Sequence, residues 1–310
     1  MDLIDRKKEA AAHTAEHAFA GALSKMFPGL KVLKVELGEV NSVTLGIESL
    51  DWDTALKAEM AVNGVIAEAR PVRIHTFKNL DEAKEEFEGL RSRDDRIAGE
   101  VRVVEIEGFD CAACAGAHVQ NTAECSYFLI SGLSESGGAV KVEFLVGEAA
   151  RKRALELSAL CFKAAKALST SVDNVEKAAE KAKLECYALR GRLMDLTGEV
   201  LKMVQPIDAG PFKLYKACLK GADKGTLMEW AGRTIERDER SVVALAIREK
   251  DFSHVVLARG EGLSFDCRKV LEEALGGKGF KGGGKPNFAS GIVRGEECER
   301  DIEAVTALLG

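Results

Sequence analysis

The strongest constraint on the fold is a long middle segment in which small and apolar residues recur at alternating spacings of four and three. Residues 150–168 carry one such run and residues 175–200 carry a second, with the polar stretch STSVD between them. Heptad spacing gives a helix one apolar face, and two such helices joined by a short turn form an antiparallel hairpin. We therefore expect a helical hairpin over residues 148–203, which separates residues 1–147 from residues 204–310.

This hairpin has two interpretations. Two apolar seams that face each other are already satisfied, which favours a simple spacer. The alternative is a contact between two copies of the chain. The spacer is the preferred interpretation, and the contact between copies stays open.

The two flanking parts differ in their patterns. Residues 1–147 predict an α+β domain: a helix over residues 3–26 that ends at the breaker FPG, a helix ended by Pro71, and several strands with alternating apolar residues. Residues 204–310 predict an α/β domain. Its stretches SVVALAI and HVVLARG are continuous apolar runs, typical of strands covered on both faces, and KGTLMEWAGRTIER and CRKVLEEAL have helical spacing.

Composition and charge predict a cytoplasmic protein with reduced cysteines and, at most, a local contact with nucleic acid. No apolar run approaches the roughly 20 residues of a membrane span, and the charged N-terminus lacks the apolar core of a signal peptide, so a cytoplasmic protein is expected. The eight cysteines are scattered, which favours reduced thiols, some of them metal ligands, over a disulfide framework. The net charge is −6, but residues 201–310 hold 18 Lys and Arg against 17 Asp and Glu. A nucleic-acid contact should therefore be local and lie in this part.

Two pairs of potential metal ligands stand about a hundred residues apart. His13 and His17 are four residues apart on the first predicted helix, so both imidazoles lie on one side of it. Cys114 and His118 are also four apart, within the small-residue stretch CAACAGAHVQNT. Three nitrogens and one sulfur suit zinc. The spacing leaves open whether the fourth ligand is permanent, in a structural site, or gives way to water or substrate, in a catalytic one.

These two motifs resemble those of a known family. HTAEHAFAGAL and GEVRVVEIEGFDCAACAGAHVQNTAEC are similar to the zinc motifs of the alanyl-tRNA synthetase editing domain, which free-standing alanyl-tRNA editing proteins share. The resemblance runs from about residue 3 to residue 130. It implies that His13, His17, Cys114 and His118 bind zinc, and that Thr14 lies near the aminoacyl group as a candidate catalytic residue. The activity implied is hydrolysis of the ester that joins a wrong amino acid, serine or glycine, to alanine tRNA.

Three departures from the family pattern affect this interpretation. Ala117 stands where the family has threonine, and the chain begins almost at HTAEH, so the β-barrel that usually precedes it is expected to be absent. Cys111 forms a CxxC with Cys114, which allows a redox pair or another ligand set. We favour zinc, because a thioredoxin-like βαβ pattern is missing around the CxxC. Glu16, beside the ligands, is expected on a solvated face.

The stretch KGGGKPNFASG, residues 281–291, resembles a signature in the C-terminal domain of alanyl-tRNA synthetase, a domain also attached to DHH phosphoesterases. The resemblance implies binding of the tRNA elbow and dimerisation. Successive glycines expose backbone N–H groups and the cations add charge, although a flexible surface loop explains the glycines equally well. Phe280 and Phe288 are expected in the core rather than stacked on bases. The candidate tRNA-binding residues are Lys278, Lys281, Gly282, Gly283, Gly284, Lys285 and Arg294.

Together the motifs predict three parts: a zinc editing-type domain (1–147), a helical hairpin (148–203) and a tRNA-binding-type C-terminal domain (204–310). The expected function is zinc-dependent trans-editing of mischarged alanine tRNA, without tRNA charging, because the activation part is missing. The expected partner is tRNA, and a homodimer formed through the C-terminal domain or the helical hairpin stays open. One alternative is a non-catalytic module that binds RNA or a protein partner and uses zinc for its fold. Another is hydrolysis of a small aminoacyl ester or amide.

Overall fold

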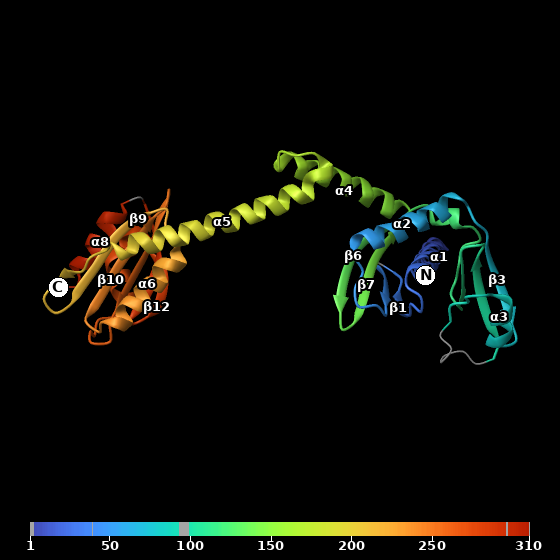
Figure 1. Cartoon of the computed structure of the whole chain (residues 1–310), viewed down its shortest axis with the longest axis horizontal. Coiled ribbons are helices and arrows are strands. Elements are labelled where there is room, and N and C mark those ends of the chain that lie inside the picture. The colour runs from blue at the N-terminus through green and yellow to red at the C-terminus, as the bar shows by residue number, and fades with distance from the viewer. Residues whose placement is uncertain (1–2, 39, 93–98, 296, 310) are drawn as a thin grey trace. The chain divides into compact units, whose positions relative to one another are not determined.

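The computed structural model describes residues 3–38, 40–92, 99–295 and 297–309, and many of its elements are labelled in Figure 1. The chain divides into two compact units, Met1–Val172 and Asp173–Gly310. Each unit is a mixture of helices and sheets, as the sequence predicts. Among the described helices, none combines the length and the apolar content that crossing a membrane would require.

The first unit is built around an antiparallel sheet in the order β1-β2-β7-β6. Its strands are β1 (Val32–Glu36), β2 (Asn41–Leu45), β6 (Phe128–Ser136) and β7 (Ala139–Val146). The sheet shares one hydrophobic core with α1 (Leu3–Met26) and α2 (Trp52–Ala67). In this core the rings of Phe19, Phe128 and Phe144 are fully buried and in contact, with centroids 5.3 Å and 5.2 Å apart. The predicted helix over residues 3–26 is confirmed, and β1 and β2 pair antiparallel.

The loop that follows a second sheet of the first unit carries half of the candidate metal ligands. Its antiparallel order is β3-β4-β5, and α3 packs against β3 and β4. The bounds are β3 (Val72–Phe77), α3 (Leu80–Glu86), β4 (Val101–Ile106) and β5 (Asp110–Ala113), followed by the 3₁₀ helix η2 (Thr122–Cys125). β5 contacts α1, so the chain just after β5 reaches the helix that bears His13 and His17.

The predicted hairpin segment is helical. α4 (Glu148–Ala167) belongs to the first unit, where Ala150 is buried beside β6 and β7. The short 3₁₀ helix η3 (Val172–Asn174) precedes α5 (Val175–Lys202), which belongs to the second unit. Packing of one helix on the other stays a prediction, as do the boundaries of the three-part division.

The second unit holds a six-stranded sheet in the order β12-β13-β11-β10-β9-β8. β10 pairs with β9 in parallel, and the other pairs are antiparallel. Leu245 on β10 packs with α6 and the end of α5, whereas its neighbour Ala244 packs with α7 and α8 on the other face of the sheet. Figure 1 shows α6 and α8 on opposite sides of β10. The predicted burial of both faces of β10 is thus confirmed. The bounds are β8 (Ile207–Asp208), β9 (Lys213–Lys220), α6 (Lys224–Arg237), β10 (Ser241–Arg248), β11 (Phe252–Arg259), α7 (Cys267–Leu275), η4 (Gly276–Lys278), β12 (Lys281–Lys285), β13 (Phe288–Arg294) and α8 (Cys298–Ala307).

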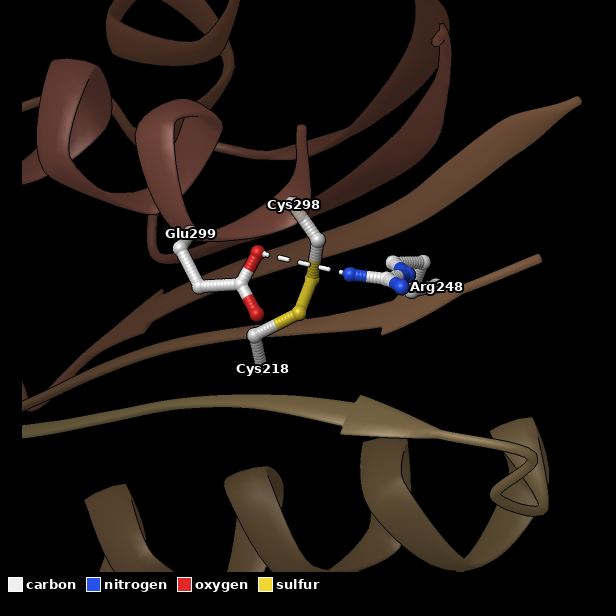
Figure 2. The surroundings of a disulfide bond; sticks show 4 residues. All are labelled: Cys218, Arg248, Cys298 and Glu299. Atoms are coloured by element: carbon white, nitrogen blue, oxygen red, sulfur yellow. Dashed lines mark ion pairs between the residues drawn. A yellow bond between two sulfur atoms is a disulfide. The ribbon is translucent and has the colours of Figure 1, made fainter. Parts of the chain in front are cut away.

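One expectation about the cysteines is wrong. Cys218 on β9 and Cys298 at the start of α8 form a disulfide, shown in Figure 2 beside the ion pair of Arg248 and Glu299. The two cysteines are 80 residues apart in sequence, and only the packing of α8 on β9 brings their Cα atoms within 6.0 Å. Spacing along the chain could not reveal this pair. The other six cysteines are free, as expected.

Candidate metal centre

Four side chains from distant parts of the first unit converge. The potential ligand atoms of His13, His17, Cys114 and His118 all lie within 4.8 Å of one another. Cys114 Sγ is 3.5 Å from both His13 Nε2 and His118 Nε2. The two histidines of α1 lie one turn apart, and the loop after β5 brings the thiol and the third imidazole to them. The structure thus brings together all four residues that the two motifs nominate.

The loop after β5 fits closely around His13. A Cβ atom added to Gly116 would collide with the His13 ring, so only glycine allows the loop this close. Arg102 donates hydrogen bonds from Nη1 to the carbonyls of Cys114 and Gly116, at 3.2 Å and 2.5 Å. The glycine of this small-residue segment therefore lets the backbone pass close to His13.

The Thr14 hydroxyl contacts the imidazole of His118. The hydroxyl donates to the Ala10 carbonyl at 3.0 Å and accepts from Val119 N at 3.2 Å. His118 Nδ1 lies 3.1 Å from the same oxygen. Because the hydroxyl proton is already given to Ala10, His118 Nδ1 carries the proton and Nε2 is left free to bind a metal. Thr14 is only 1% exposed, so these contacts favour a positioning role; its role near the aminoacyl group stays a prediction.

Burial sets the protonation of the four ligands. It lowers the pKa of His13, lowers that of His17 well below 6.5, and lowers that of His118 to about 3. The same burial raises the pKa of the Cys114 thiol. At neutral pH the three imidazoles are therefore neutral and able to act as ligands, and the thiol must release a proton when a metal binds. This donor set, three imidazole nitrogens and one sulfur, fits zinc.

A large cavity borders the cluster. Its volume is about 1310 Å³, and its lining includes His13, His17 and Cys114, together with Leu30 and with Val32, the first residue of β1. Glu16 also lines it and is 2% exposed, so the expected solvated face is wrong for this residue. The reason is that α1 lies inside the unit and is surrounded on most of its sides, which a helical pattern rich in alanine does not disclose.

Cys111 faces away from the cluster. Its side chain packs with Val101, Val103 and Ala83 in the small core between α3 and the β3-β4-β5 sheet, whereas Cys114 packs with the main core of the unit. Both thiols are free. The alternatives based on the CxxC, a redox pair or a different ligand set, therefore find no support in this geometry.

The glycine- and lysine-rich stretch is a β-hairpin rather than a flexible loop. β12 and β13 pair antiparallel from Lys281–Ile292 to Lys285–Phe288. Phe280 and Phe288 pack against the two cores of the second unit, as expected. Lys278 lies outside the hairpin and forms ion pairs with Asp301 at 2.8 Å and with Glu297 at 3.5 Å. Its ammonium is thus engaged within the protein, while the strand lysines and Arg294 are exposed.

Sequence reasoning missed three residues behind the ligands. Arg91 and Asp110 form an ion pair beside His17, and Arg102 holds the ligand loop. An arginine or an aspartate alone is no signal, because such residues are usually on the surface. The only hint in the sequence is that Asp110 stands four residues before Cys114, the spacing that the ligands themselves share.

Comparison with known proteins gives two family matches. Residues 101–141 match the threonyl and alanyl tRNA synthetase second additional domain, and residues 211–310 match the DHHA1 domain. The chain is 31% identical over 250 residues to an alanine–tRNA ligase of Ignicoccus hospitalis, covering 78% of this chain and 26% of that one. It therefore spans about a quarter of that ligase, and 37% of the alanine–tRNA ligase of Bdellovibrio bacteriovorus.

Shorter relatives match as well. The alanyl-tRNA editing protein AlaX-L of Pyrococcus horikoshii is 24% identical over 304 residues, covering 93% of this chain and 71% of that protein. Among solved structures, the C-Ala domain of Aquifex aeolicus alanyl-tRNA synthetase aligns with 34% of this chain and 94% of that one, at 23% identity and a TM-score of 0.31. The two family matches and the relatives confirm the resemblance that the motifs predict: the chain is similar to alanyl-tRNA synthetases and to alanyl-tRNA editing proteins, with the match to the second additional domain preceding the match to the DHHA1 domain.

Proposed function

We propose that the chain is a zinc-dependent deacylase that acts in trans and hydrolyses the ester of mischarged alanine tRNA, removing serine or glycine. The observation that carries the proposal is the convergence of His13, His17, Cys114 and His118 beside a cavity of about 1310 Å³. The likeness to alanyl-tRNA editing proteins supports tRNA as the substrate class.

Different residues of the chain would bind the metal, the aminoacyl end and the phosphates of the tRNA. His13, His17, Cys114 and His118 would hold the zinc ion, which when bound supplies a Lewis acid to orient and polarise the ester. The cavity beside them offers apolar surface from Leu30 and Val32 to the terminal nucleotide and its amino acid. Lys281, Lys285 and Arg294, on the second unit, would contact phosphates of the tRNA.

Deacylation of seryl-, glycyl- and alanyl-tRNA by the zinc-loaded protein tests the proposal. We expect hydrolysis of the seryl or glycyl ester, and its loss after chelation or in His17→Ala. The matched control is His75→Ala, because His75 pairs with Glu105 at 2.9 Å and is not one of the clustered ligands. Equal rates for the chelated and the zinc-loaded protein would show that zinc has no part in the reaction.

A second function has an observation of its own. Catalytic zinc sites usually have three protein ligands, whereas four converge here, as in closed structural sites. The second candidate is therefore a non-catalytic module that binds RNA or a protein partner and uses zinc for its fold. It predicts tRNA binding without turnover of any charged tRNA, together with unfolding of the first unit on chelation.

A further inference from the structure

One buried nitrogen at the candidate metal centre is left without a hydrogen bond. His17 is 5% exposed, and its Nδ1 atom is fully buried with no hydrogen-bond partner in the part of the chain that the structure describes. A neutral imidazole carries its proton on one of its two nitrogens. If Nε2 binds the metal, the proton must sit on Nδ1, which then needs an acceptor in the protein interior.

Asp110 offers that acceptor. Its Oδ2 atom lies 3.9 Å from His17 Nδ1, and its side chain is 5% exposed. Arg91 fixes the carboxylate from the other side, donating from Nε to Oδ1 at 2.8 Å and from Nη2 to Oδ2 at 2.7 Å. Each carboxylate oxygen can accept more than one hydrogen bond, so Oδ2 has capacity left for His17.

Arg91 is itself tied to both ligand-bearing elements. Its backbone pairs with β5, through Arg91 N to Cys111 O at 3.0 Å and Ala113 N to Arg91 O at 2.8 Å. Its side chain also donates from Nη2 to the His17 carbonyl at 3.2 Å. The guanidinium thus bonds both to α1, at His17, and to β5, at Asp110. These bonds hold the Asp110 carboxylate beside the His17 imidazole.

Gly21 makes room for this arrangement. A Cβ atom added there would lie 2.6 Å from Asp110 Oδ1 and 2.7 Å from Asp110 Cβ. A glycine inside a helix is less favourable than alanine by about 1 kcal/mol. The close approach of Asp110 accounts for a glycine at this place in α1.

We propose that Asp110, clamped by Arg91, is the positioning residue that fixes the tautomer and the orientation of His17 for metal binding. A carboxylate facing Nδ1 favours the form that is protonated there and leaves Nε2 free for the ion. The inference rests on the zinc site of the proposed function. It does not require that the site hydrolyse an ester, so its test measures metal binding.

The test measures zinc affinity by competition with a chromophoric chelator, and the absorption spectrum of the Co²⁺-substituted protein. We expect Asp110→Asn to weaken zinc binding by about 10- to 100-fold and to change the Co²⁺ spectrum, because His17 loses its fixed tautomer. The matched control is Glu105→Gln, which alters the carboxylate partner of His75 at a different histidine pair. It should leave affinity and spectrum as in the wild type.

A second variant guards against loss of folding, since Asp110→Asn leaves the buried Arg91 without its partner charge. Gly21→Ala keeps both charges, favours the helix and displaces the carboxylate; it should also weaken zinc binding and change the spectrum. For a variant that unfolds without metal, the midpoint of zinc-dependent refolding combines affinity with folding stability, so the Co²⁺ spectrum of the metal-loaded variant carries the test. Affinities within threefold of wild type in both variants overturn the inference, as does an equal loss in Glu105→Gln. Absence of deacylation in the wild type would count against the proposed function alone.

Discussion

A single hydroxyl, that of Thr14, contacts one of the candidate ligands from within the protein. Replacing Thr14 by valine keeps the shape of the side chain but removes the acceptor of Val119 N–H and His118 Nδ1. We expect Thr14→Val to lose about 1–3 kcal/mol of stability and to weaken zinc binding about 10- to 100-fold. Urea unfolding and zinc competition measure the two effects.

The chain offers a matched control for this substitution. Thr122 is equally buried in the same unit, and its hydroxyl donates to Val65 O and accepts from Arg70 N, both at 2.8 Å. Thr122→Val should lose similar stability and keep its zinc affinity. If Thr14→Val instead lowers turnover with unchanged zinc affinity, Thr14 acts on the substrate rather than on His118.

The buried imidazoles also make the metal-free protein sensitive to acid. The pKa of His118 is lowered from 6.5 to about 3 by burial, so below pH 6.5 the unfolded chain binds a proton that the folded site refuses. Stability is therefore lost as the pH falls from 6.5 towards 3. For His118 alone this amounts to about 2 kcal/mol between pH 7 and pH 5.

Urea unfolding of metal-free protein at both pH values measures this loss, and His118→Asn is the comparison. The variant should lose about 2 kcal/mol less than the wild type over the same interval. An identical pH dependence in the two proteins would mean that His118 is not held neutral by the fold.

The sequence predicted the convergent residues but not the residues that support them. The sequence alone indicates the candidate ligands, because they stand at helical spacing or in a small-residue stretch: His13, His17, Cys114 and His118. The pairing of Arg91 with Asp110 arises because the backbone of Arg91 pairs with β5, and the burial of Glu16 arises because α1 packs among other elements of the unit. No local pattern encodes such contacts, because they join segments far apart in sequence.

At the level of elements, the glycines of β12 serve the packing of the sheet as well as any ligand. A Cβ atom on Gly282 would collide with the Phe280 ring and with the backbone of β13, whereas one on Gly283 would meet open space. Gly282→Ala should therefore destabilise the second unit by about 1–3 kcal/mol, through overpacking against Phe280. Gly283→Ala is the matched control and should unfold like the wild type, as measured by thermal or urea denaturation.

Gly283→Ala also tests whether the backbone N–H groups of β12 bind phosphate of the tRNA. If phosphate approaches the exposed backbone of β12, Gly283→Ala should weaken tRNA binding although it leaves stability unchanged. If the Gly283→Ala protein binds tRNA with wild-type affinity, the backbone of β12 does not contact phosphate, and only the lysines of this strand contribute to tRNA binding.

The elements that the sequence did not predict share a physical cause. The strand β9 alternates poorly because it pairs in parallel with β10 and has helices on both sides, and β12 is glycine-rich, so neither shows the period of two that marks a half-buried strand. The disulfide of Cys218 with Cys298 likewise depends on α8 returning to β9. The helix α1 was predictable because it ends at the breaker FPG, and β10 was predictable because it is a continuous apolar run.

For the molecule as a whole, the proposed function assigns chemistry to the first unit and most of the RNA affinity to the second. The net charge of −6 opposes tRNA, so binding must come from local cations such as Lys281 and Lys285, which are exposed on β12. Lys278 is less suited to this role, because Asp301 and Glu297 already pair with it. Neutralising the two strand lysines should therefore affect the binding of tRNA and leave the metal centre intact.

We expect Lys281→Gln combined with Lys285→Gln to raise KM for the charged tRNA with kcat unchanged, and to lower the salt dependence of tRNA binding by about two units of slope. Hydrolysis of a small aminoacyl ester should be the same as in the wild type, because such a substrate has no phosphates to contact. Lys202→Gln is the control, a lysine of α5 paired with Glu199 at 2.6 Å. If the double variant deacylates tRNA with wild-type KM at every salt concentration, the substrate is recognised through its aminoacyl end alone, as hydrolysis of a small ester or amide would require.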